Sequence, residues 1–143
     1  MAVDKRLLKI IKNRMQYTDE ETQAFCDNPS NENILSKYAE LKNKQIVAEI
    51  IVSKGCNSRH KVGTKIYLDG EGNLLQDKNP SKLCIHLLKA ISPIVNTMHE
   101  LFYTDVDPNR IRFNRGQCID VGIECGGWGR VVVDVRMEDI KKE

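Results

Sequence analysis

Apolar residues recur at helical spacing through the first part of the chain. From Val3 to Met15 they return every three or four positions, which is typical of one face of an amphipathic helix. Thr18 followed three residues later by Glu21 matches a capping box, so a second, short helix is predicted to begin there. After a run of turn-forming residues, apolar positions in 34–41 predict a third helix. Residues 1–44 are therefore expected to be helical throughout.

From residue 45 onward the pattern favours strands and one long helix. Residues 46–52 are rich in β-branched side chains and too short for a good helix, which predicts a buried strand, and 65–69 predicts a second. The strongest helical pattern covers 80–103, with Pro80 expected at its first position. Pro93 is expected to kink this helix or to split it.

The C-terminal part predicts a hairpin. Apolar residues alternate with polar or small ones in 119–123 and again in 131–135, and the glycine-rich segment 126–129 lies between them. The predicted fold class is therefore α+β: a small antiparallel sheet of about four strands with one long helix packed on a face, preceded by N-terminal helices. We expect residues 1–44 to form a helical extension and 45–143 the α+β core domain.

Composition narrows the functional classes. The chain has 143 residues, 41% of them hydrophobic, so disorder is excluded, and its net charge of +2 is spread evenly. It contains neither an apolar run of about 18–20 residues nor a secretory signal pattern, so we expect a cytoplasmic protein without a membrane partner. A nucleic-acid partner is not expected, because only three arginines hint at a basic stripe: Arg110, Arg112 and Arg115.

Cysteine and histidine carry the candidate chemistry. Cys56 and His60 share one polar loop, where a thiolate and an imidazole can reach one cation. Cys84 lies near the start of the long helix, whose dipole stabilises a thiolate. Cys118 begins the predicted hairpin, and Asp120 follows on the same face as a possible further ligand. In a chain without an export signal these thiols are expected to be reduced.

The other notable side chains have structural interpretations. Cys26 and Cys125 are predicted to be core residues, because free cysteine behaves as a small hydrophobic group. His86 and His99 are expected on helix surfaces, solvated or hydrogen-bonded there. Trp128 is interpreted as a packing lid, with a pocket wall as the alternative.

The chain also resembles a known family through a set of short motifs: Gly55-Cys56, the run from His60 to Gly63, Cys84 in the helix, Cys118-x-Asp120 and the segment from Cys125 to Arg130. Over Lys44 to Met137 this layout is similar to that of small, functionally uncharacterised bacterial and archaeal proteins. Thr64 stands where that family usually has an acidic residue, and Ile85 where many relatives have proline. The resemblance implies this placement of the thiols and no particular activity.

The leading hypothesis is a cytoplasmic accessory protein of anaerobic metabolism that binds zinc or an iron–sulfur cluster. Its expected ligands are three cysteines and one histidine: Cys56, His60, Cys84 and Cys118. Thiolate and imidazole suit zinc or iron–sulfur centres better than hard cations. Trp128, and Arg112 or Arg115, are expected near the cofactor.

Two alternatives stay open. The first is a thiol-dependent enzyme or small-molecule binder, with Cys84 as nucleophile and His60 as base, or with Cys56 as the reactive thiol, in a pocket lined by Trp128 and Tyr67. The second is a non-catalytic subunit of an oxidoreductase complex. Here the N-terminal helices would bind a protein partner or a second copy of the chain.

Overall fold

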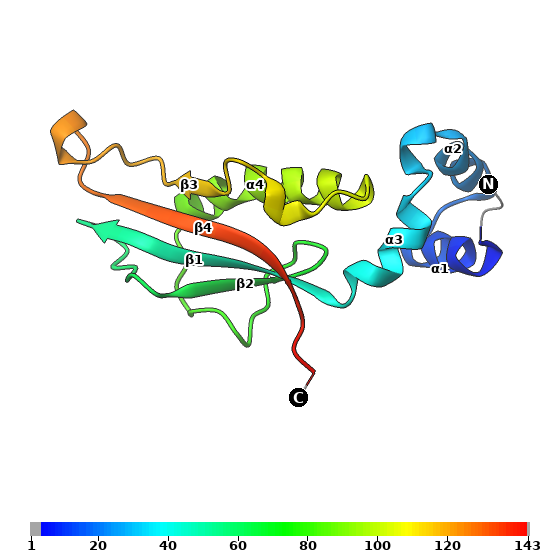
Figure 1. Cartoon of the computed structure of the whole chain (residues 1–143), viewed down its shortest axis with the longest axis horizontal. Helices are drawn as coiled ribbons and strands as arrows, with labels where there is room; N and C mark the ends of the chain where they lie inside the picture. The colour runs from blue at the N-terminus through cyan, green and yellow to red at the C-terminus, as the bar shows by residue number, and fades with distance from the viewer. Residues whose placement is uncertain (1–3, 143) are drawn as a thin grey trace. The chain divides into compact units, whose positions relative to one another are not determined.

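The computed structural model describes residues 4–142 and divides the chain into two compact units, with the division between Leu41 and Lys42. The fold is α+β, as predicted, with helices alone in the first unit and a four-stranded antiparallel sheet with a long helix in the second (Figure 1). No helix within 4–142 is long and apolar enough to cross a membrane.

The first unit contains three helices and one short 3-10 turn: α1 (Lys5–Met15), α2 (Asp19–Asp27), η1 (Pro29–Asn31) and α3 (Ile34–Leu41). Asp4 caps α1, while Val3 lies outside the described residues. The predicted capping box is present, since Thr18 and Glu21 each bond the other's backbone N–H. Apolar side chains from α1 and α3 form a small core: Ile11, Leu35 and Tyr38.

The second unit is built on four strands in the order β2-β1-β4-β3, all antiparallel. Their bounds are β1 (Lys44–Lys54), β2 (Lys65–Asp69), β3 (Arg115–Gln117) and β4 (Arg130–Asp139). Ile46 pairs with Leu68 on one side and with Met137 on the other, so these apolar side chains share a face. β1 and β4 are distant in the sequence, yet their pairing forms the centre of the sheet.

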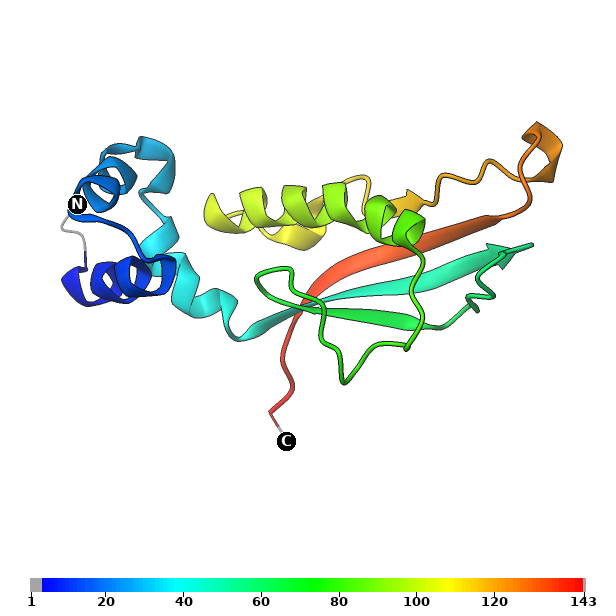
Figure 2. The ribbon, with the colours of Figure 1, turned by 180° about the vertical axis from the view of Figure 1, so that it is seen from behind.

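Helix α4 (Ile85–Tyr103) covers the apolar face of this sheet, as Figure 2 shows from behind. Side chains from the helix and from the strands form the core, among them Leu87, Ile91, Met98, Ile50, Val133 and Val135. The predicted helix start at residue 80 is wrong. The Asn79 side chain bonds both the N–H and the carbonyl of Tyr67, which keeps this segment beside β2 until the helix begins after Cys84.

Pro93 neither ends nor divides α4, which runs through it without a break. The proline is on the exposed side of the helix. Water can therefore reach the backbone carbonyl that loses its helical partner, and the cost of the missing N–H is reduced.

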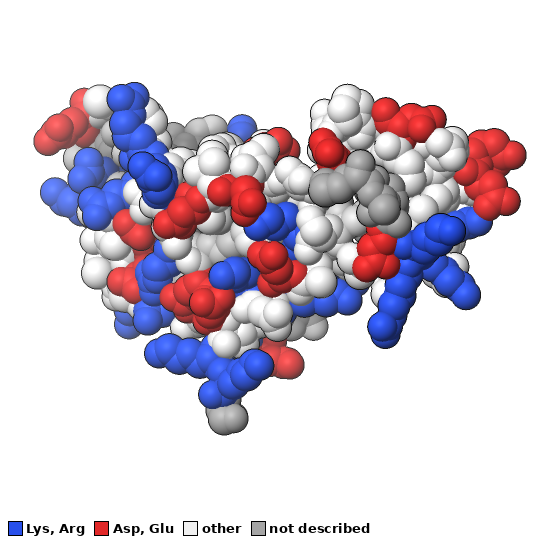
Figure 3. Space-filling model, turned by 45° about the vertical axis from the view of Figure 1, so that its right-hand side comes forward, with Lys and Arg blue, Asp and Glu red and all other residues white. Residues whose placement is uncertain are grey.

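The predicted strand over 119–123 is also wrong. Strand β3 ends at Gln117, and the following segment is a loop that contains the short turn η3 (Ile123–Cys125). Ile119, Val121 and Ile123 are 63%, 56% and 75% exposed, so their alternation does not mark a buried face. A second 3-10 turn, η2 (Pro108–Arg110), joins α4 to β3. Acidic and basic side chains are mixed over the surface in view in Figure 3.

Candidate functional site

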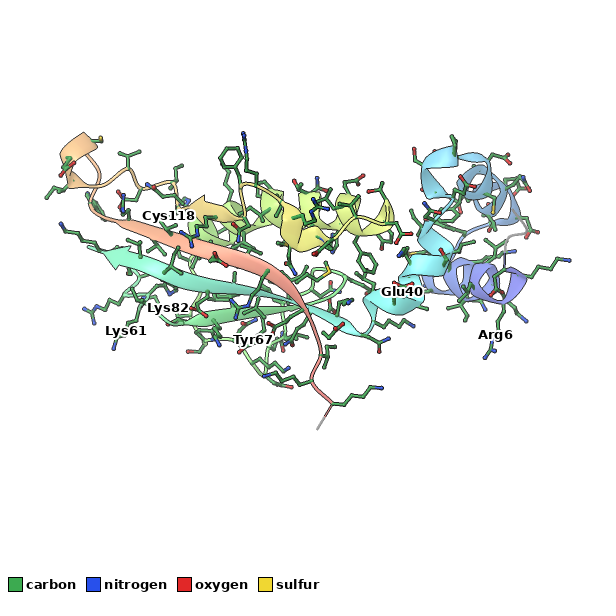
Figure 4. All side chains as sticks on the ribbon, in the orientation of Figure 1. Arg6, Glu40, Lys61, Tyr67, Lys82 and Cys118 are labelled. Atoms are coloured by element: carbon green, nitrogen blue, oxygen red, sulfur yellow. The ribbon has the colours of Figure 1, made fainter. Side chains whose placement is uncertain are left out.

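A pocket of about 450 Å³ lies at the N-terminal end of α4. Three separate segments form it: the loop after β1, the start of α4 and the chain that runs from the end of β3 into the start of β4. The four predicted ligands, Cys56, His60, Cys84 and Cys118, all line this one pocket. Figure 4 labels Cys118 at this end of the sheet. The sequence prediction thus selected residues that the fold brings to a common cavity.

Cys84 is the N-cap of α4 and is half-buried. Burial raises the pKa of its thiol, but the backbone N–H groups of His86 and Leu87 and the Ser58 hydroxyl together outweigh it and lower the pKa. The sulfur makes no capping hydrogen bond of ordinary geometry, so these groups act on it as nearby dipoles. Cys84 therefore forms its thiolate more readily than an ordinary cysteine.

His60 is buried, with 9% of its surface exposed, and it contacts the backbone of Cys84. The Cys84 N–H donates to Nε2 of the imidazole over 3.2 Å. Because an N–H can only donate, Nε2 carries no proton, and the neutral ring has its proton on Nδ1. Burial, and then the charge of Lys82, lower the pKa of His60 and favour this neutral form. The imidazole thus holds the backbone of Cys84.

Asp120 organises the loop between β3 and β4. Its carboxylate accepts three backbone N–H groups at 2.9 to 3.0 Å, from Gly122, Trp128 and Gly129. The Gly122 N–H is the largest influence on the pKa of Asp120 and lowers it. Burial acts in the opposite direction, and the other two N–H groups lower the pKa further. In the structure the carboxylate, expected from the sequence as a possible ligand, holds the loop.

Glycine permits the close approach of this loop to the end of β1. A Cβ atom at Gly129 would lie 2.1 Å from the carbonyl oxygen of Lys54 and 2.4 Å from that of Gly55. Gly55 itself has a φ of +62° and passes against the Trp128 carbonyl. The Gly55-Cys56 pair and the glycine-rich segment are therefore packed against each other, and this contact fixes where Cys56 enters the pocket.

Cys118 continues the pairing of β3 with β4. Its N–H donates to the carbonyl of Val131, and its sulfur accepts the Val131 N–H at 3.4 Å. Both Cys118 and Cys56 are half-buried, and no disulfide joins any of the five cysteines. Three free thiols from three segments therefore share the pocket.

Trp128 lines the pocket and is 72% exposed, which fits a pocket wall and contradicts its interpretation as a buried lid. Its backbone is fixed by Asp120, so the indole stands on an anchored loop. Arg130 lines the pocket as well. The sequence prediction missed Arg130, and also Ser58 and Leu87, because nothing in their local pattern indicates proximity to the thiols.

Other expected residues lie elsewhere. Arg115 pairs with Asp134 at 3.1 Å, and the Arg112 guanidinium lies 4.4 Å from the centre of the Phe113 ring; neither arginine lines the pocket. Tyr67 is absent from the lining too. It lies on β2, with the Lys78 amine 5.6 Å from its ring centre.

The two cysteines predicted for the core differ in outcome. Cys125 is exposed in η3, so that prediction is wrong: the loop around it is held by the Asp120 carboxylate rather than by apolar packing. Cys26 is half-buried in α2, so it is partly covered but is not one of the buried core residues. His86 is exposed beside the pocket, and the His99 Nε2 lies 2.8 Å from the Gly70 carbonyl oxygen, as expected for helix-surface histidines.

Within residues 4–142 no group of three or more histidine, cysteine, aspartate or glutamate side chains is arranged to hold a metal ion. A scan against protein-family models finds no match for this chain, and searches of curated proteins and of solved structures find none either. The resemblance and the metal site both stay predictions.

Proposed function

We propose that this protein binds a small molecule in the pocket at the start of α4 and reacts with it through the Cys84 thiolate. The observation that carries the proposal is the convergence of three segments around Cys84. They supply a half-buried thiol with a lowered pKa, a neutral imidazole that holds its backbone and an exposed indole in the same lining. Such a combination suits thiol-dependent chemistry.

The chemistry follows from the charge on sulfur. A thiolate at Cys84 donates an electron pair to an electrophilic carbon of the bound molecule, a C–S bond forms, and the bond to the leaving group breaks with its electrons. The dipoles of the His86 and Leu87 N–H groups favour negative charge on the sulfur before the attack. The role of His60 is to position the reactive residue, because its Nε2 is bonded to the backbone rather than to the sulfur.

Alkylation by iodoacetamide tests this proposal. We expect Cys84 to react faster at pH 7 than cysteine in a short unstructured peptide, with peptide mass spectrometry assigning the modified residue. Ser58→Ala removes a hydroxyl that favours the thiolate, so it is expected to shift the pH profile of this reaction upward. Cys125→Ser is the matched control, since Cys125 does not line the pocket and its loss leaves the profile unchanged.

Two results would overturn the proposal. One is an alkylation rate of Cys84 equal to that of cysteine in the unstructured peptide. The other is one equivalent of zinc or iron in protein purified without oxygen, lost in Cys118→Ser. That second result would favour the metal-binding alternative, which is supported by the common location of Cys56, His60, Cys84 and Cys118.

A further inference from the structure

We infer that the pocket takes a small organic anion: a carboxylate on an aliphatic or aromatic body, with the carboxylate at Arg130 and the body against Trp128, Ile119 and Val121. This inference rests on the proposed function for the location of the site and adds the chemical class of the ligand. It is carried by the apolar walls and by the distribution of charge around them.

The pocket is lined by large apolar side chains that stay exposed to solvent instead of packing into the core. Ile119, Val121 and Trp128 line the pocket and are more than half exposed, and Ile85, the residue after Cys84, is 73% exposed. Large apolar side chains that gather in the open mark a binding surface, because their exposure to water is unfavourable. A volume of about 450 Å³ is within the range of small-molecule sites.

The charges near the pocket favour an anion. Arg130 lines it, and no carboxylate among residues 4–142 forms a salt bridge with this guanidinium. Asp120 is the acidic residue of the lining, and its oxygens accept three backbone N–H groups. Lys82 is close enough to act on the His60 ring. Arginine recognises carboxylates by paired hydrogen bonds, so Arg130 is the expected contact.

Two further basic residues lie toward the end of the sheet that carries the pocket: Figure 4 shows Lys61 and Lys82 at the same end of the sheet as Cys118. A positive field at a largely apolar pocket raises the local concentration of anions and disfavours cations.

Trp128 provides the assay, because the chain has one tryptophan. The intact protein is titrated with octanoate, and with octylammonium and 1-octanol as probes of the same apolar body. We expect a saturable blue shift of tryptophan emission with octanoate, weakened by added salt, and a weaker response to the other two.

Variants locate the contact. Arg130→Gln is expected to weaken octanoate binding about tenfold while leaving octanol unchanged. Arg115→Gln is the matched control, since this arginine pairs with Asp134 and lies outside the lining. Circular dichroism checks the fold of each variant, and the salt dependence of the unsubstituted protein gives a second measurement that needs no variant.

Equal binding of octanoate and octanol, or no effect of Arg130→Gln, would overturn the inference. Its failure is distinguishable from that of the proposed function. Rapid alkylation of Cys84 without octanoate binding would support the reactive thiol of the proposed function and refute the anion site. Octanoate binding that depends on Arg130, together with an ordinary alkylation rate at Cys84, would support the anion site and refute the reactive thiol. If both hold, saturating octanoate is expected to slow alkylation of Cys84.

Discussion

Protonation of His60 is expected to destabilise the second unit as the pH falls below about 6.5. The folded protein keeps the imidazole neutral, because burial and the Lys82 charge lower its pKa from the ordinary value of 6.5. The unfolded chain takes up the proton near that ordinary value. Between the two pKa values the unfolded state therefore binds more protons, and the free energy of unfolding decreases as the pH falls.

The size of the effect follows from the one proton involved. A single group contributes at most about 1.4 kcal/mol per pH unit within this window and nothing well above it. The structure adds a local consequence, since a proton on Nε2 removes the acceptor of the Cys84 N–H. The buried ring would then face that N–H with a second donor, and the first turn of α4 loses one of its anchors.

Urea unfolding at pH 7.5, 6.5 and 5.5 measures this slope. His60→Gln has a side-chain oxygen that can accept the Cys84 N–H and does not titrate, so the variant is expected to lose the His60 contribution while other groups stay the same. His86→Gln is the control, because His86 is exposed. If the unsubstituted protein and His60→Gln show the same pH dependence, the neutral, buried His60 described above is incorrect.

Three further predictions follow from the packing. Gly129→Ala is expected to cost about 3 kcal/mol, because its Cβ would lie 2.1 Å from the rigid Lys54 carbonyl oxygen. Gly63 has a φ of +88°, and an added Cβ there would have no atom within 4 Å, so Gly63→Ala is expected to cost about 1–2 kcal/mol from backbone strain alone. A larger loss for Gly63→Ala than for Gly129→Ala in urea unfolding would contradict the close approach of Gly129 to Lys54. Trp128→Ala is expected to cost less than about 1 kcal/mol, since the side chain is 72% exposed, and a loss near 3 kcal/mol by the same measurement would instead indicate a buried lid. A fragment of residues 42–143 is expected to unfold cooperatively in a thermal melt followed by circular dichroism, because its sheet and helix share a core; a gradual melt would show dependence on the first unit.

Local patterns were sufficient where neighbours in the sequence decide the structure. The capping box at Thr18 and Glu21 uses backbone groups within one turn, so it is visible in the sequence. The β-branched runs in β1 and β4 likewise predict buried strands, and both are central. These elements are enough to define the α+β class.

Patterns failed where a distant contact decides. Alternation in 119–123 suggests a strand with one buried face, yet its apolar side chains are exposed, and two of them, Ile119 and Val121, line the pocket. Helix α4 begins at residue 85 and not at the predicted residue 80, because the Asn79 side chain bonds to the backbone of Tyr67 on β2. Local helix propensity does not reveal this contact. In both places polar side chains that bond the backbone replace the expected regular structure.

The common location of the thiols depends on topology. Lys54 at the end of β1 pairs with Arg130 at the start of β4, so the loop that follows β1 and the loop that precedes β4 leave the sheet at the same end. Cys84 at the start of α4 lies in the same pocket. The sequence supplied the residues but not this pairing, because the two strands are separated by most of the second unit.

The spacing between Cys118 and Asp120 has a structural reason that also explains the glycines after it. The Cys118 backbone still bonds to Val131 on β4. Two residues later the Asp120 carboxylate lies within the loop and accepts hydrogen bonds from three backbone N–H groups. Those N–H groups can approach one carboxylate because the segment is rich in glycine: a Cβ atom at Gly127 would lie 2.1 Å from an Asp120 oxygen. One motif therefore sets the position of Cys118 and the backbone position of Trp128 together. Replacing the Asp120 carboxylate is therefore expected to shift this loop and to change ligand binding in the pocket, although Cys56, Cys84 and Cys118 are all still present.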